Sequence, residues 1–124
     1  MTGLTNDEAR ALLSAAFANL LDPHAPVEAL SRHYAETCVQ EVDGERMTYA
    51  QFLEHARAIK QSIRSATVTI DRLIVQGSTI ADVHIVESEK PNGEKTRLKV
   101  IAFTTVEQGR IMSVEELTCV VDCF

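Results

Sequence analysis

The first half of the chain repeats apolar residues at helical spacing. The first repeat follows Thr5, which forms a capping box with Glu8 and places the start of a helix at Asn6. Its apolar stripe, one face of a 3.6-residue period, consists of Leu12, Leu13, Ala16, Phe17, Leu20 and Leu21. Residues 22–26 include two prolines, so the helix is expected to end there.

Two further helices are predicted before the middle of the chain. Pro26 suits the first position of a shorter helix that runs to about Tyr34. Thr48 forms a second capping box with Gln51 and predicts the start of a third helix. The apolar stripe of this third helix is Phe52, Ala56, Ile59 and Ile63.

The remaining segments have the period of strands. Residues 38–42 form a short strand that is expected to turn at Asp43-Gly44. From Ala66 onward the period is two, and turn signals divide this part into strands at about 67–76, 79–89, 95–107 and 110–121. Short connections pair consecutive strands antiparallel, so the chain is predicted to be one α+β domain spanning 1–124. Three N-terminal helices would pack on a strongly curved antiparallel sheet that curls into a cone.

Composition and charge narrow the possible functions. A length of 124 residues suffices for one core, and the net charge of −6 without a Lys/Arg cluster argues against nucleic acid as a partner. No signal peptide or membrane-spanning run is evident, which favours a cytoplasmic protein without a membrane partner. The three cysteines, Cys38, Cys119 and Cys123, lack zinc-like spacing and are expected to be reduced thiols.

The order of elements and several fragments resemble the SnoaL-like proteins of the NTF2-like superfamily. The fragments are His33-Tyr34 ahead of 38–40, the turn at 42–44, Thr48-Tyr49 with Phe52 and His55, 101–103, and 109–111 before 115–118. The resemblance implies a cone-shaped domain with a pocket between sheet and helices, and a homodimer formed through the outer face of the sheet. It does not imply one chemistry.

Alternation along the last strand indicates a candidate catalytic carboxylate. Met112, Val114, Glu116, Thr118 and Val120 share one face, which we expect to point inward. Apolar neighbours would partly desolvate Glu116 and raise its pKa, as general acid or base chemistry requires. The alternative is a solvated Glu116 at the mouth of the cone.

The second long strand contains a candidate catalytic histidine and a carboxylate that could orient it. Asp82 and His84 share one face, so the carboxylate could orient the imidazole for proton transfer. Residues at positions i and i+2 lie about 6.5–7 Å apart along a strand, which leaves direct contact open. The alternative interpretation is that His84 is a surface histidine or a hydrogen-bonded structural one. No histidine or carboxylate motif typical of a metal site is present, and no cofactor is implied.

Other polar and aromatic residues are candidates for the pocket wall. Tyr34 suits a wall with its hydroxyl turned to a ligand, and Gln40 is an inward amide on the short strand. His55 lies near the apolar stripe of the third helix, either at the pocket or at its boundary. The predicted apolar lining is Phe17, Tyr34, Phe52, Ile59, Phe103 and Val114, with Thr118 as a further polar contact.

The resemblance supports a polyketide cyclase type of site more than a ketosteroid isomerase type. Ketosteroid isomerases of the superfamily place a carboxylate base near the short strand of this chain, where the plausible equivalents are Gln40, which is no base, and Glu41, which faces the other way by alternation. Their paired donors, a tyrosine on the first helix and a protonated aspartate, are not evident either, since the first helix offers Phe17 and no tyrosine. The isomerase assignment is therefore weakened. SnoaL-like polyketide cyclases carry a late-strand acid that corresponds by region to Glu115 or Glu116.

The leading hypothesis is a small-molecule pocket for a hydrophobic or carbonyl compound. As an enzyme it would use cofactor-independent acid–base chemistry, with Glu116 acting beside His84 or Tyr34. The rival hypothesis is a noncatalytic ligand-binding or dimerisation module. Apolar residues on both faces of the long strands, such as Val100 and Ile101, support a homodimer in either case.

Overall fold

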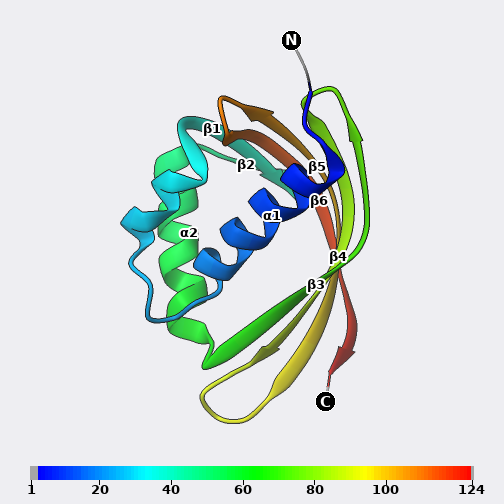
Figure 1. Cartoon of the computed structure of the whole chain (residues 1–124). Coiled ribbons are helices and arrows are strands. Elements are labelled where there is room, and N and C mark those ends of the chain that lie inside the picture. The colour runs from blue at the N-terminus through cyan, green and yellow to red at the C-terminus, as the bar shows by residue number, and fades with distance from the viewer. Residues whose placement is uncertain (1–2, 124) are drawn as a thin grey trace.

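The protein is a two-layer domain in which helices cover one face of a six-stranded sheet (Figure 1). The computed structural model describes the backbone of residues 3–123 and side chains through Val121. The helices are α1 (Asn6–Leu20), the 3-10 helix η1 (Val27–Arg32) and α2 (Tyr49–Ser62). The strands are β1 (Tyr34–Val42), β2 (Glu45–Met47), β3 (Ser65–Gln76), β4 (Thr79–Glu89), β5 (Lys95–Glu107) and β6 (Arg110–Cys123).

Both predicted capping boxes are present. The Thr5 hydroxyl accepts from the Glu8 backbone N–H, and the Glu8 carboxylate accepts from the Thr5 N–H. Thr48 and Gln51 make the same reciprocal pair at the start of α2. These side chains satisfy amides that have no partner within the helix, so they fix where α1 and α2 begin.

The second predicted helix is shorter and of another type. It is a 3-10 helix that ends at Arg32, and Tyr34 is already the first residue of β1. The third helix, α2, follows the β1–β2 hairpin, in the place predicted for it after the short strand. The prediction for the second helix is wrong in its type and in its end at Tyr34. Six residues between a proline-rich turn and a strand make only short-range 3-10 hydrogen bonds.

The sheet order is β2-β1-β6-β5-β4-β3, and one of its pairs is parallel. The meander β3–β6 and the β1–β2 hairpin are antiparallel, as short turns require. However, β1 and β6 pair parallel, so the expected all-antiparallel sheet is wrong. These two strands lie far apart in sequence, and no tight turn between them dictates an antiparallel direction.

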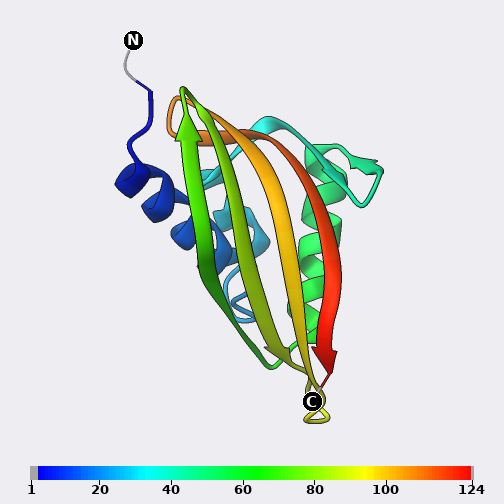
Figure 2. The same ribbon diagram turned by 90° about the vertical axis from the view of Figure 1, so that its right-hand side faces the viewer.

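The sheet is open, with β2 and β3 at its edges, and does not close into the expected cone. Figures 1 and 2 show the long strands bending round the helices without curling strongly. The strand register shifts between Ile70 and Arg72 and at two points along the β5–β6 pair. Such bulges bend a strand locally and increase its twist.

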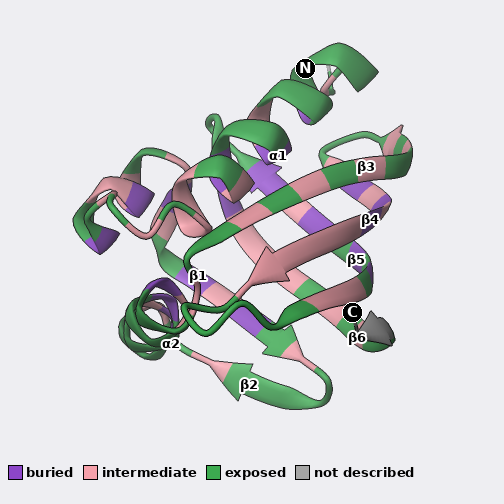
Figure 3. Ribbon diagram, turned by 90° about the horizontal axis from the view of Figure 1, so that it is seen from below, coloured by how far each residue is buried: buried purple, intermediate pink, exposed green. Residues whose placement is uncertain are grey.

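The core lies between this sheet and the helices, where the buried residues of Figure 3 gather. Fully buried side chains include Leu13 of α1, Leu30 of η1, and Ile80 and Ile111 of the sheet. Cys38 is a buried free thiol and Cys119 an exposed one, while the Cys123 side chain lies outside the described residues. Among the described residues, no helix is long and apolar enough to cross a membrane.

A buried lysine joins the two α-helices. The Lys60 Nζ of α2 donates to the Asn19 carbonyl at 2.5 Å and to the Asp22 carbonyl at 2.8 Å, both at the end of α1. Burial lowers the Lys60 pKa, and the Asp22 carboxylate opposes this shift. The ammonium therefore caps a neighbouring helix, whereas a lysine in a last turn usually complements its own helix dipole.

We expect Lys60→Met to lower the free energy of unfolding by about 1–3 kcal/mol, because methionine retains the apolar stem but leaves two carbonyls without their donor. Arg57→Met is the control, since the Arg57 ion pair with Glu54 is exposed and 3.4 Å long, and no other is seen for Arg57 within the described residues. This control should change stability by less than about 0.5 kcal/mol. Urea unfolding of both variants makes the comparison, and equal effects would refute the capping role.

Candidate functional site

The strand register assembles inward-facing residues into rows that cross the sheet. One row runs from Val42 on β1 through Glu116 and Ala102 to Asp82 on β4. Its neighbour on one side is the row Thr118, Val100 and His84, and on the other the row Gln40, Val114, Thr104 and Ile80. Because side chains alternate along a strand, these rows all face the helices.

The rows form the floor of a cavity of about 260 Å³. Its walls come from α1, β1 and α2, and the lining is mainly apolar. All the predicted site residues but one line this cavity: Phe17, Tyr34, Gln40, Phe52, His55, Ile59, Asp82, His84, Val114, Glu116 and Thr118. The three candidate catalytic residues, Asp82, His84 and Glu116, thus line one cavity.

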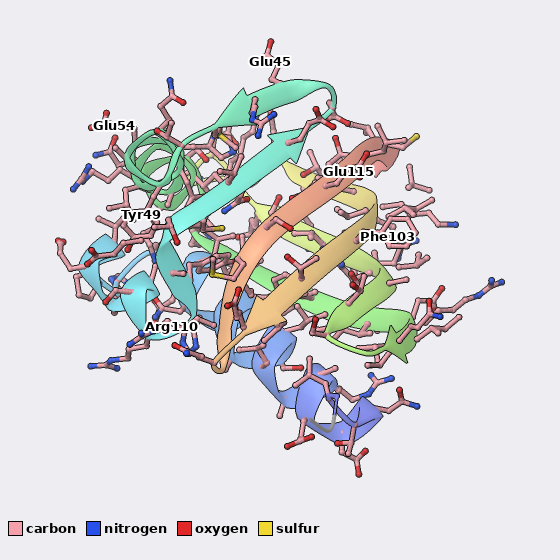
Figure 4. All side chains as sticks on the ribbon, turned by 90° about the horizontal axis from the view of Figure 1, so that it is seen from above. Glu45, Tyr49, Glu54, Phe103, Arg110 and Glu115 are labelled. Atoms are coloured by element: carbon pink, nitrogen blue, oxygen red, sulfur yellow. The ribbon has the colours of Figure 1, made fainter. Side chains whose placement is uncertain are left out.

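Phe103 is the exception. Its exposed fraction is 56%, and it lies on the outer face of β5 opposite Ala81 and Glu115. Figure 4 shows Phe103 and Glu115 on the side of the sheet away from the helices. The prediction that Phe103 lines the pocket is therefore wrong, because alternation along β5 makes Val100, Ala102 and Thr104 the inward residues.

The inward face of β6 differs from the prediction at both of its ends. Thr105 pairs with Ser113 but Val106 pairs with Ile111, so Met112 is the extra residue of a bulge. Ile111 therefore takes the buried position expected for Met112. At the other end, Val120 is 63% exposed. The inward pattern holds for Val114, Glu116 and Thr118 only.

His84 and Asp82 form a buried pair. The His84 Nδ1 lies 2.7 Å from the Asp82 Oδ2. The two side chains therefore make direct contact, although their backbones are two residues apart along the strand. The Phe17 ring of α1 covers the imidazole, with ring centroids 4.4 Å apart. An ionised Asp82 accepts from Nδ1–H, which fixes the ring orientation and turns Nε2 away from the carboxylate.

Glu116 lies in the same row as Asp82, with Ala102 between them. Desolvation raises the pKa of the Glu116 carboxyl, charge on His84 opposes the shift, and the Asp43 and Asp82 carboxylates add to it. A carboxyl group in such surroundings holds its proton to higher pH than a solvated one. Glu116 is only partly buried, so a ligand or solvent proton can reach it.

Hydrogen bonds from the turn residue Asp43 hold β6 at the positions of Glu116 and Thr118. The Asp43 carboxylate accepts from the Thr118 backbone N–H at 2.7 Å and from the Thr118 hydroxyl at 2.5 Å. The Asp43 N–H donates to the Glu116 carbonyl at 2.9 Å. Asp43 adopts a positive φ of 52°, which aspartate tolerates better than most residues. The sequence predicts the turn but not this contact, which joins segments 75 residues apart.

Two polar residues complete the wall. Tyr34 is buried with its ring centroid 4.7 Å from that of Phe52, and burial raises its pKa, so the hydroxyl keeps its proton and can donate. Gln40 is buried beside Val114, and its Nε2 has no hydrogen-bond partner among the described residues. In the same part of the chain, no group of three or more His, Cys, Asp or Glu residues is placed to hold a metal ion.

Comparison with known proteins identifies the family. The profile of the SnoaL-like domain matches residues 14–114. The chain belongs to the SnoaL-like family. An uncharacterised protein of Schizosaccharomyces pombe is 33% identical over 106 residues, covering 86% of this chain and 82% of the relative.

Solved structures share the SnoaL-like fold at low identity. AusH from Aspergillus nidulans matches with a TM-score of 0.78 and 8% identity, over 93% of this chain and 86% of that one. A Mycobacterium tuberculosis LEH-like epoxide hydrolase matches with a TM-score of 0.72 and 17% identity, over 92% and 84% of the two chains. At these identities the likeness extends to the α+β, NTF2-like fold alone.

The raised Glu116 pKa predicts a pH-dependent effect of Glu116→Gln on stability. Below the ordinary carboxyl pKa of 4.5, Glu116 is protonated in both folded and unfolded chains. As pH rises through the interval up to the folded-state pKa, the unfolded chain loses this proton first, so the wild type loses stability. Glutamine does not titrate, so the variant should gain stability relative to wild type as pH increases.

Urea unfolding at several pH values between about 4 and 7 measures this difference. The matched control is Glu115→Gln on the exposed outer face of the same strand, which should show no such trend. A stability difference for Glu116→Gln that stays constant with pH would contradict a desolvated carboxyl group.

Proposed function

We propose that this SnoaL-like protein is a cofactor-independent acid–base enzyme that acts on a small hydrophobic carbonyl compound. The observation that carries the proposal is the meeting of Glu116 with the buried His84–Asp82 pair in one mainly apolar cavity. Enzymes that move protons at carbon place titratable groups with altered pKa values in such surroundings. The cavity volume of about 260 Å³ suits a compound smaller than a typical drug.

In the proposed reaction, the ionised Glu116 removes a proton from the carbon next to the carbonyl group. The electron pair of that C–H bond moves to the carbonyl oxygen and gives an enolate. A donor from His84 or Tyr34 stabilises the oxygen, and the proton held by Glu116 returns to the same carbon or, where a C=C bond is conjugated with the enolate, to the far carbon of that bond. The first route exchanges the proton or inverts the carbon, the second shifts the double bond, and neither needs an external oxidant or cofactor.

Each residue in this scheme has a structural reason for its role. The raised pKa of Glu116 makes it a stronger base than an ordinary carboxylate once it is ionised. Asp82 orients His84, and Phe17 holds the ring from the helix side. The apolar lining would exclude water and strengthen the electrostatic interactions that stabilise an enolate.

Deuterium exchange tests this function without a known substrate. We expect the protein to catalyse deuterium incorporation into the methyl group of acetophenone in D₂O, measured by NMR. Glu116→Gln should reduce the enzymatic rate by about 10²–10⁴-fold, the usual loss when a general base is removed. Glu115→Gln should exchange at the wild-type rate, because its side chain is exposed on the opposite face.

Absence of catalysed exchange across a panel of small ketones would favour the rival function, a noncatalytic binding module. Under that hypothesis Glu116→Gln would change which ligands bind and have no rate to affect. A rate equal in wild type and Glu116→Gln would remove Glu116 from the mechanism and leave the cavity as a binding site.

We also propose that the outer face of the sheet forms a homodimer. Large apolar side chains stand exposed there: Ile74, Ile101, Phe103 and Leu117 are each more than half exposed. Exposed apolar surface of this kind on adjacent strands usually marks an association site. A second copy fits the requirement that the same patch be complementary to itself.

Light scattering at tens of micromolar protein, a concentration that brackets ordinary dimer affinities, should give the mass of a dimer. Leu117→Glu should convert it to a monomer, because leucine at this position is 67% exposed and a buried carboxylate would oppose association. Glu41→Gln, on an exposed position of β1, serves as control. A wild-type monomer would contradict the proposal.

A further inference from the structure

Two buried polar atoms at the cavity lack hydrogen-bond partners among the described residues. One is the donor Nε2 of Gln40, a residue only 4% exposed, and the other is the acceptor Oδ1 of Asp82, which is 3% exposed. Both residues line the cavity. A buried polar group without a partner costs about 1–3 kcal/mol, so such groups are normally paired with a ligand, water or protein.

Two other polar groups of the cavity wall are already hydrogen-bonded. Asp82 Oδ2 is bound to His84 Nδ1, and the Thr118 hydroxyl is bound to Asp43. Gln40 Nε2, whose side chain also lies beside the Cys38 thiol, and Asp82 Oδ1 are the fully buried donor and acceptor of this mainly apolar space that have no geometric hydrogen bond among the described residues. Hydrogen-bonding groups of opposite kind on an apolar wall set both the identity and the orientation of a ligand.

The strand order separates these two groups across the floor. Gln40 lies on β1 and Asp82 on β4, with β6 and β5 between them. Three inter-strand spacings of about 4.8 Å place their backbones about 14 Å apart along the sheet. Gln40 belongs to the row that ends at Ile80, two residues before Asp82, and the small Ala102 lies in the row between Glu116 and Asp82. The ligand must therefore carry its polar groups at opposite ends.

We infer that the site takes a small hydroxy-carbonyl compound, with its carbonyl oxygen accepting from Gln40 Nε2 and its hydroxyl group donating to Asp82 Oδ1. The apolar skeleton lies above Ala102, beside Glu116. This orientation puts the carbon next to the carbonyl near the proposed base, so the inference rests on the proposed function for its chemistry. The recognition itself needs only the two unpaired atoms.

Four compounds with one aromatic skeleton test the recognition. They are 4-hydroxyacetophenone with both groups, acetophenone with the carbonyl, 4-ethylphenol with the hydroxyl, and ethylbenzene with neither. We expect 4-hydroxyacetophenone to bind about tenfold more tightly than either single-group compound, because each missing group leaves a buried partner unpaired. Binding is followed by NMR titration below pH 7, where the phenol keeps its proton.

Gln40→Leu assigns the carbonyl contact. The variant should lose the preference for acetophenone over ethylbenzene and keep the preference for 4-ethylphenol over ethylbenzene. Leucine removes a buried unpaired amide, so the fold should tolerate it. Glu41→Gln, the exposed neighbour on β1, should bind all four compounds as the wild type does.

The outcomes separate this inference from the proposed function. Equal affinity for the four wild-type ligands, or tightest binding of ethylbenzene, would overturn the recognition of a hydroxy-carbonyl compound even if acetophenone exchanges deuterium. Tight and selective binding of 4-hydroxyacetophenone without exchange would support the inference and refute the enzyme. A Gln40→Leu variant that keeps its carbonyl preference would overturn the assigned contact.

Discussion

Pairing of β6 on both of its sides determines the shape of the site. On one side β6 runs antiparallel to β5 and continues the meander, and on the other it runs parallel to β1. This second pairing brings Gln40 and Val42 from the early part of the chain beside Val114 and Glu116 near its end. A shift of one residue in either register would turn Glu116 to the outer face, because side chains alternate along a strand. The Asp43–Thr118 hydrogen bonds lock the register where the parallel pairing ends.

Burial of Asp82 and His84 lowers the stability of the fold but fixes the positions of both side chains. Burying the Asp82 carboxylate and the His84 imidazole requires removing both from water, and their mutual contact only partly offsets that loss. Leucine and valine at these positions would give a simpler core. Instead, Phe17 from α1 covers the imidazole and Ala102 leaves space between the two carboxylates. The arrangement is what a binding or reaction site requires and what a purely structural core avoids.

Local patterns were sufficient for much of the fold, and they failed where contacts are long-range. The capping boxes at Thr5 and Thr48 depend on residues three positions apart, so the helix starts followed from sequence. Alternation likewise placed Asp82, His84 and Glu116 on one face. The direction of β1 against β6 depends on segments distant in sequence and was missed. The bulge at Met112 depends on register with β5, which a single strand does not reveal, whereas the outward position of Phe103 follows from alternation along β5 itself.

The contact of Lys60 with the end of α1 also affects how the cavity can open. Since the ammonium group binds carbonyls at both Asn19 and Asp22, α1 and α2 are tied together at one end while each covers the cavity from a different side. Separating the two helices to widen the space above the sheet would therefore require breaking both of these hydrogen bonds. The ease with which a ligand enters between the helices would then depend on a single ammonium group, one residue beyond the cavity residue Ile59.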